Sequence, residues 1–208
     1  MKKSLPILIS ILILSCQNEP KVNIQKIKFE LDSIMVLDQK HRNELNSLYL
    51  EFGLESSEFQ EVFVKQHLID SMNVIYVESL IKKLGKYPGN SLLGHSTGKV
   101  AFFVLQHSSE EIQLKYLDLI LEAAESNELD KGSAAMYHDR CLMYKGEPQI
   151  YGTQIRSREF LDSLIGENKR EFYLHPIKDT VKIDSVRMWN GLIPLEEYLI
   201  SFGLSRWN

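Results

Sequence analysis

The residues of this sequence best suited to chemistry are a histidine, two aspartates and three arginines. His107 is the candidate general base, because imidazole is the side chain that titrates near neutral pH. Asp139 or Asp38 could orient the imidazole by accepting a hydrogen bond from one ring nitrogen. A carboxylate or phosphate could be held by one of three arginines, which are Arg42, Arg140 and Arg187. These candidate catalytic and binding residues predict acid–base chemistry or recognition of an anionic group.

Asp38 stands within an apolar helical pattern and not on its polar side. It follows Ile34 by four residues and precedes Leu45 by seven, which places all three on one helix face. Arg42, one turn later, is within reach of it. Polar residues interrupt apolar segments in the same way at Asp70 and Asn73, at Gln106 and His107, and at Asp139 and Arg140. Buried polar groups need partners and bundles build sites from facing helices, so we expect these residues to share one pocket.

The segment GEPQIYGTQI, residues 146–155, concentrates hydrogen-bonding side chains with almost no charge. We interpret residues 149–155 as a strand that closes the pocket. Gln149, Tyr151 and Thr153 would then lie on one face and Gln154 on the other. Gly152 would allow a backbone or a ligand to approach closely. The expected ligand-binding side chains are Arg42, Gln39, Arg140, Gln149, Tyr151, Thr153, Gln154 and Arg187.

Short motifs containing these residues run through most of the chain. They are Asp38-Gln39-x-x-Arg42, Asp70-x-x-Asn73, Gln106-His107, Asp139-Arg140 and Gly146-x-x-Gln149-x-Tyr151-Gly152-Thr153-Gln154, followed by Arg187, Gly191 and Tyr198. This set resembles a bacterial family of uncharacterised proteins, many of them predicted lipoproteins. Residues 157–169 look like an insertion relative to its pattern. The family has no established activity, so the resemblance supports the grouping of the residues and implies no reaction.

The elements that must position these residues are mostly helices. Apolar spacing, caps and glycines predict helices at 24–52, 56–84, 97–107, 109–127 and 131–145, and a closing helix after Pro194. Aromatic and β-branched segments predict short strands at 149–155, 171–175 and 181–183. The expected class is mainly α (α+β), a helical bundle followed by a small β element and a closing C-terminal helix.

The start of the chain predicts export and a lipid anchor. Lys2 and Lys3 precede an apolar run of about ten residues, which is too short to span a bilayer, and Ser15-Cys16 follows at once. This ending resembles the lipobox of bacterial lipoproteins, in which the cysteine is lipidated. Residues 1–15 are the expected signal peptide, 16–23 a tether and 24–208 a single globular domain. The predicted location is the bacterial cell envelope, with the membrane as partner, and Gln17 is compatible with the outer membrane. The alternative is an ordinary signal peptide.

Other classes of function find little support in the sequence. A composition that is 44% hydrophobic, with a net charge of −4, is ordinary for a globular protein and gives no reason to expect a nucleic-acid partner. No metal or cofactor is expected, because His138 and Cys141 are only two potential ligands and GHSTGK at 94–99 is too short for a phosphate loop. Cys141 is expected to be a small buried hydrophobe, with a catalytic thiol as the alternative.

Three hypotheses of function follow. The first is a cell-envelope lipoprotein whose polar pocket binds a small anionic or polar ligand. The second is a hydrolase or transferase that acts on a cell-envelope component with His107 as general base. The third is a purely structural or scaffolding lipoprotein. Access of solvent to His107 distinguishes them, because a sealed imidazole indicates structure and an open one indicates binding or catalysis.

Overall fold

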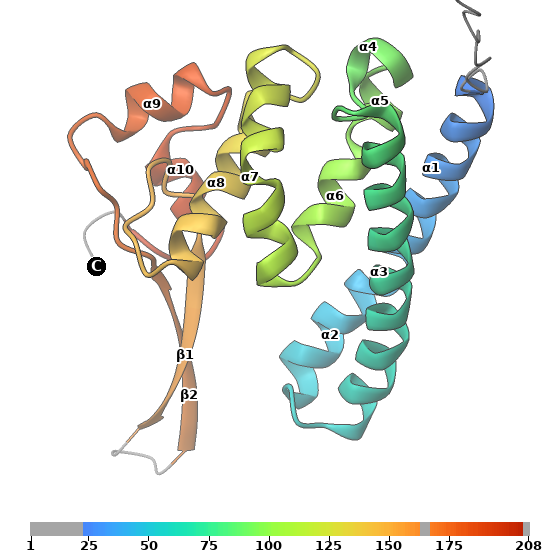
Figure 1. Ribbon diagram of the computed structural model, residues 1–208. Coiled ribbons are helices and arrows are strands. Elements are labelled where there is room, and N and C mark those ends of the chain that lie inside the picture. The colour runs from blue at the N-terminus through green and yellow to red at the C-terminus, as the bar shows by residue number, and fades with distance from the viewer. Residues whose placement is uncertain (1–22, 163–166, 206–208) are drawn as a thin grey trace, which may run out of the picture.

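The protein is described by a computed structural model that covers residues 23–162 and 167–205 (Figure 1). The predicted signal peptide, Cys16 and residues 17–22 of the predicted tether lie outside the described residues. The chain is mainly α with a small antiparallel β element and C-terminal helices, which confirms the predicted class. Within the described part, no helix is both long enough and apolar enough to cross a membrane.

The N-terminal bundle and the C-terminal segment contain all the described elements. The helices of the bundle are α1 (Ile24–Gln39), α2 (Arg42–Phe52), α3 (Ser57–Leu84), α4 (Asn90–Leu93), α5 (His95–Gly98), α6 (Val100–Gln106), α7 (Glu110–Glu125) and α8 (Lys131–Tyr144). The elements that follow are β1 (Ile155–Asp162), β2 (Glu167–Leu174), α9 (Ile183–Trp189) and α10 (Leu195–Ile200). In Figure 1 the two strands form a ribbon that projects from the helices.

Local capping explains where the longer helices begin and end. The side chains of Ser56, Ser109 and Asp130 each accept a hydrogen bond from a first-turn backbone N–H, of α3, α7 and α8 respectively. Gly85 ends α3 in the left-handed conformation. The predicted helices 56–84, 109–127 and 131–145 are therefore confirmed within a few residues at each end.

The apolar core lies between the bundle helices. Buried residues of α1, α3, α6, α7 and α8 form one cluster, in which Leu31, Val77, Leu105 and Ile120 are fully buried. A smaller cluster of Ile183, Leu195 and Leu199 joins α9 to α10. Helix α6 contacts α1, α3 and α7, and its C-terminal end therefore lies where several elements meet.

The prediction of one helix over residues 24–52 is wrong, because a turn at residues 40 and 41 interrupts the helix and separates α1 from α2. Gln66 of α3 compensates for the break. Its Nε2 donates to the carbonyl oxygen of Asp38 at 3.0 Å, and its Oε1 accepts from the backbone N–H of His41 at 3.2 Å. A side chain from another helix thus satisfies backbone groups that an unbroken helix would pair internally. The predicted helix 97–107 is likewise divided, into α5 and α6.

The predicted strand 149–155 is also wrong. Only Gln149 forms an isolated bridge, with Ile177, and β1 starts at Ile155. The antiparallel partner of β1 is β2, which pairs Ile155 with Leu174 and includes most of the predicted strand 171–175. Of the proposed insertion at 157–169, residues 157–162 belong to β1 and residues 167–169 to β2, and residues 163–166 lie outside the described residues. Residues 181–183 form no strand, and Ile183 instead begins α9, a helix that the apolar spacing did not predict.

Candidate functional site

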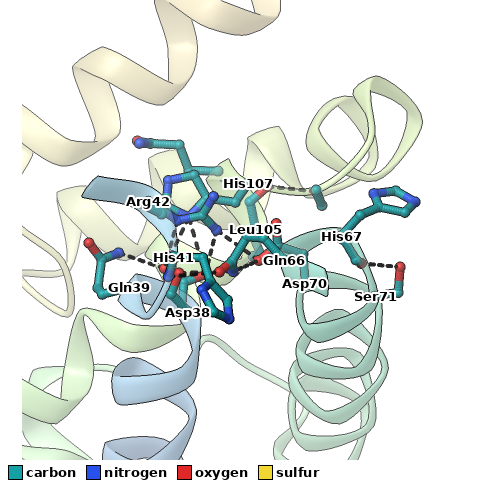
Figure 2. A network of polar contacts seen from close by, with 12 residues as sticks. Asp38, Gln39, His41, Arg42, Gln66, His67, Asp70, Ser71, Leu105 and His107 are labelled. Atoms are coloured by element: carbon teal, nitrogen blue, oxygen red, sulfur yellow. Dashed lines mark hydrogen bonds and ion pairs between the residues drawn. The ribbon is translucent and has the colours of Figure 1, made fainter. Parts of the chain in front are cut away.

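Asp38 is the centre of a polar cluster, here called the His107 cluster, which joins α1, α2, α3 and α6. Nδ1 of His107 lies 3.1 Å from Oδ2 of Asp38. Nη2 of Arg42 donates to Oδ1 of Asp38 at 3.0 Å and to Oδ1 of Asp70 at 2.8 Å. Figure 2 shows these side chains converging from different helices. The break after α1 lets Arg42, the first residue of α2, turn back toward the end of α1.

Two glutamines complete the His107 cluster. Nε2 of Gln39 donates to Oδ2 of Asp38 at 2.6 Å. Gln66, which the sequence analysis missed, donates to Oδ1 of Asp70 at 2.7 Å in addition to its bonds at the helix break. Its position one turn before Asp70, on the face that also carries Asn73, was the available signal.

The carboxyl group of Asp38 is held in its charged form. Burial alone would raise its pKa, but hydrogen bonds from His107 and Arg42 outweigh burial and leave the pKa below its ordinary value. A carboxylate only accepts hydrogen bonds, so Nδ1 of His107 is assigned the proton. Among the described residues, Nε2 of His107 has no hydrogen-bond partner. The imidazole is therefore fixed at one nitrogen and available at the other.

His107 opens onto a cavity of about 290 Å³ between α3 and the start of α7. Val74, Ile75 and Ile112 supply the apolar walls. The polar walls come from His67, Asp70, Ser71, His107, Ser108 and Ser109. The side chain of His107 is 19% exposed, whereas that of Asp38 behind it is 1% exposed. The imidazole is thus reachable from solvent while the carboxylate that orients it is not, the arrangement expected of a binding or catalytic group.

Asp139 is the centre of a second polar cluster, here called the Asp139 cluster. Its carboxylate accepts hydrogen bonds from the backbone N–H groups of Ile150 at 2.7 Å, Tyr151 at 3.1 Å and Thr153 at 3.0 Å. Oγ1 of Thr153 donates to it as well, at 2.9 Å. These bonds explain why residues 150–153 form no strand, because their N–H groups are taken by a side chain of α8. Asp139 is fully buried, and no hydrogen bond or ion pair joins it to His107.

Arg187 and Tyr198 hold the other side of the same loop. Nη1 of Arg187 donates to the carbonyl oxygens of Tyr151 at 2.7 Å and Gly152 at 3.0 Å. The hydroxyl of Tyr198 donates to the carbonyl oxygen of Thr153 at 2.7 Å. The guanidinium also lies 4.9 Å from the centre of the Tyr198 ring. Arg187 is 1% exposed and cannot reach a ligand in solvent. Its position makes it a clamp on the backbone.

The two glutamines of the GEPQIYGTQI segment are satisfied within the fold. Gln149 donates from Nε2 to the carbonyl oxygen of His175 at 2.6 Å and accepts from the N–H of Gln154 at 2.8 Å. Gln154 donates from Nε2 to the carbonyl oxygen of Met136 at 3.2 Å. Both residues are buried. The dense hydrogen-bonding capacity of this segment is therefore used to build a loop without regular secondary structure.

Arg140 links the two clusters. Its Nε donates to Oε1 of Gln154 at 3.2 Å, and its Nη1 donates to the carbonyl oxygen of Gln106, the residue before His107, at 3.1 Å. The predicted site residues thus separate into two adjacent groups. His107, Asp38, Arg42 and Gln39 come together in one, and Asp139, Gln149, Tyr151, Thr153, Gln154 and Arg187 in the other. Their roles in catalysis or binding stay predictions.

Other candidate chemistry has less geometric support. Burial raises the pKa of the Cys141 thiol to about 11, so it is protonated at neutral pH and unsuited to nucleophilic attack. Cys141 is fully buried, and its Sγ lies 3.7 Å from the carbonyl oxygen of Gln113. No group of three or more His, Cys, Asp or Glu residues in the described ranges is placed to hold a metal ion.

Comparison with known proteins identifies a family. Residues 26–204 match DUF6624, which is described as a family of unknown function. No curated protein and no solved structure matches the chain. The match agrees with the resemblance to a family of uncharacterised proteins and adds no activity.

Proposed function

Because the chain belongs to DUF6624, a family of unknown function, we propose its function from its own residues. We propose that it is a lipid-anchored cell-envelope protein that binds a small ligand in the cavity beside His107, through a polar or anionic head group. The observation that supports this most is that only one of the two ring nitrogens of His107 is hydrogen-bonded within the protein. Nδ1 of His107 is fixed on Asp38, and Nε2 is left for a ligand.

The cavity indicates what such a ligand looks like. Its apolar part would lie against Val74, Ile75 and Ile112, and its head group would contact Nε2 of His107. A neutral imidazole accepts a hydrogen bond from a hydroxyl or amide, and a protonated one donates to a carboxylate or phosphate. Arg42 is already shared by two carboxylates, so its charge is balanced within the cluster. An anionic head group would therefore need its positive partner among the histidines of the cavity, which are His107 and His67.

A hydrolase or transferase that uses His107 as general base is the second candidate function. The favouring observation is the buried carboxylate at Nδ1, because this is how general-base histidines are oriented for proton abstraction at Nε2. Within the described ranges, no serine, threonine or cysteine is hydrogen-bonded to the imidazole of His107. The base would therefore act on water or on a hydroxyl of the ligand itself.

The test of the binding proposal is a titration followed at the histidine rings by NMR. The probes are acetate and longer alkyl carboxylates, and inorganic phosphate and its alkyl monoesters. The variants are His107→Gln and His95→Gln. His95 is an exposed histidine of α5 outside the cavity, so its variant is the matched control. We expect one probe class to shift the His107 resonances, with the response lost in His107→Gln and kept in His95→Gln. If none of the probes moves the His107 signals more than those of His95, the cluster is a structural clamp.

The lipid anchor is tested separately. It is supported by the charged start, the apolar run and Cys16. The full chain and its Cys16→Ala variant would be produced in a bacterial host and compared by mass spectrometry of the membrane fraction. The wild-type chain is expected to begin at Cys16 and carry acyl chains, and the variant to lack them. Equal masses in the two proteins would refute the anchor without affecting the cavity proposal.

A further inference from the structure

A second cavity, of about 420 Å³, lies at the other end of α7 from the His107 cavity. Its floor is formed by alanine side chains of α7 and α8. Its walls come from His138 of α8, Tyr151 of the loop held by Asp139, and Trp189 at the end of α9. The volume falls within the range of about 300–1,000 Å³ that is usual for small-molecule sites. Neither the proposed function nor the family match assigns a role to this cavity.

Three of the ten residues that line the cavity carry aromatic rings. The indole of Trp189 is 78% exposed, although burial of so large an apolar ring is favourable. The rings of His138 and Tyr151 have their centroids 6.1 Å apart and are inclined by 57°. Nζ of Lys131 lies 5.3 Å from the centre of a Trp189 ring. An exposed aromatic residue beside a cavity offers a flat surface on which a ring-shaped ligand can stack.

Polar groups of the cavity have unused hydrogen-bonding capacity. Nδ1 of His138 is buried and has no hydrogen-bond partner among the described residues. Buried polar atoms in folded proteins are nearly always paired, so a ligand hydroxyl or a water that reached this nitrogen would supply the missing partner. The hydroxyl of Tyr151 also has no partner within the described part of the chain. Both atoms can donate or accept, depending on tautomer and rotation.

The charges of the cavity balance. Lys131 and Glu125 contribute opposite charges at its rim. Burial lowers the pKa of His138, which keeps that ring neutral at physiological pH. An anion or a cation would therefore meet a like charge as well as an opposite one. An uncharged ligand with several hydrogen-bonding groups meets no such penalty.

We propose that this cavity binds an uncharged sugar ring, stacked on Trp189 and hydrogen-bonded to His138 and Tyr151. A pyranose presents an apolar C–H face, which packs on an aromatic ring, and a rim of hydroxyls that both donate and accept. A flat aromatic ligand would satisfy the stacking surface and leave the polar atoms unpaired. The sugar therefore matches both the aromatic and the polar features of the cavity.

The experiment uses Trp189 as its own reporter. The chain has two tryptophans, and Trp207→Phe leaves Trp189 as the single tryptophan, whose emission is excited selectively at long wavelength. The full chain carrying this change is titrated with N-acetylglucosamine and with glucose, and the fluorescence of Trp189 is recorded. Calorimetry then gives the affinity of the responding sugar for the Trp189→Ala and His138→Phe variants. Each change is expected to weaken binding by about tenfold or more, because one removes the stacking surface and the other a hydrogen-bonding atom.

Met188→Ala is the matched control. Met188 is 76% exposed on the same helix, next to Trp189, and does not line the cavity. It and His107→Gln are expected to leave sugar binding unchanged, and circular dichroism confirms folding of each variant. The proposal is overturned if neither sugar binds, if Met188→Ala weakens binding as much as Trp189→Ala, or if indole and benzoate bind while the sugars do not.

Discussion

Asp38 and Asp139 are both buried aspartates in apolar helical faces, but their partners differ in kind. Three of the four donors to Asp139 are backbone N–H groups, and all four come from residues 150–153. Asp38 is bound by side chains, those of Gln39, Arg42 and His107. Backbone donors fix a loop, and they use up the hydrogen-bonding capacity of the Asp139 carboxylate. Side-chain donors keep further capacity, and His107 retains a free nitrogen at a cavity. We infer that the Asp139 cluster is scaffold and that the His107 cluster is the working site.

The largest expected effect is on stability, from Asp139→Ala. The change leaves three backbone N–H groups and a hydroxyl buried without an acceptor, and each unpaired group is costly. We expect the free energy of unfolding to fall by about 3–5 kcal/mol, because each buried group left unpaired costs about 1–3 kcal/mol. Urea unfolding measures it, and Asp118→Ala, at an exposed aspartate of α7, is the control. A loss no larger than that of the control would refute the scaffold role.

Gly152→Ala tests the same loop through its backbone. Gly152 has a φ of +67°, and an added Cβ would lie 3.0 Å from both Ile177 Cδ1 and Leu195 Cδ1. Conformational strain and crowding together are expected to cost about 2–3 kcal/mol. Gly146→Ala is the matched control, because its φ is +72° and its added Cβ meets nothing within 4 Å. Equal losses in the two variants would show that the packing around Gly152 contributes nothing.

The helices and part of the His107 cluster could be predicted from sequence because their signals are local. Ser56 and Gly85 mark the ends of α3, and the spacing of Asp38 and Arg42 predicted a contact that the structure contains. The break after α1 could not be predicted, because the apolar spacing continues through it and its compensating side chain, Gln66, comes from another helix. The prediction of a strand over residues 149–155 failed for the same reason. The acceptor of the N–H groups, Asp139, lies outside the segment, and tertiary hydrogen bonds outweighed strand propensity.

Asp38→Asn removes the charge of the Asp38 carboxylate from the His107 cluster and keeps a side chain of nearly the same size and shape. The folded-state pKa of Asp38 lies below its unfolded value of about 3.9, so its contribution to stability is present above that pH and is lost as the pH falls through the folded pKa. We expect the variant to be less stable than wild type by about 1–2 kcal/mol at neutral pH. The difference should disappear as the pH is lowered below about 4. Unfolding curves over this pH range measure it, and a difference independent of pH would mean that the charge of Asp38 contributes nothing.

The smallest effect on stability is expected from His107→Gln, and it is the most informative for function. The side chain is 19% exposed, Arg42 still pairs with Asp38, and the amide of glutamine can donate in place of Nδ1. The free energy of unfolding should therefore change by less than about 1 kcal/mol. Binding at the adjacent cavity should be lost, because glutamine does not restore the imidazole Nε2. Groups kept for function are often neutral or costly for stability. A variant that loses binding and keeps its free energy of unfolding therefore indicates a working site. A loss of stability as large as that of Asp139→Ala would instead place His107 in the scaffold and remove the distinction between the two clusters.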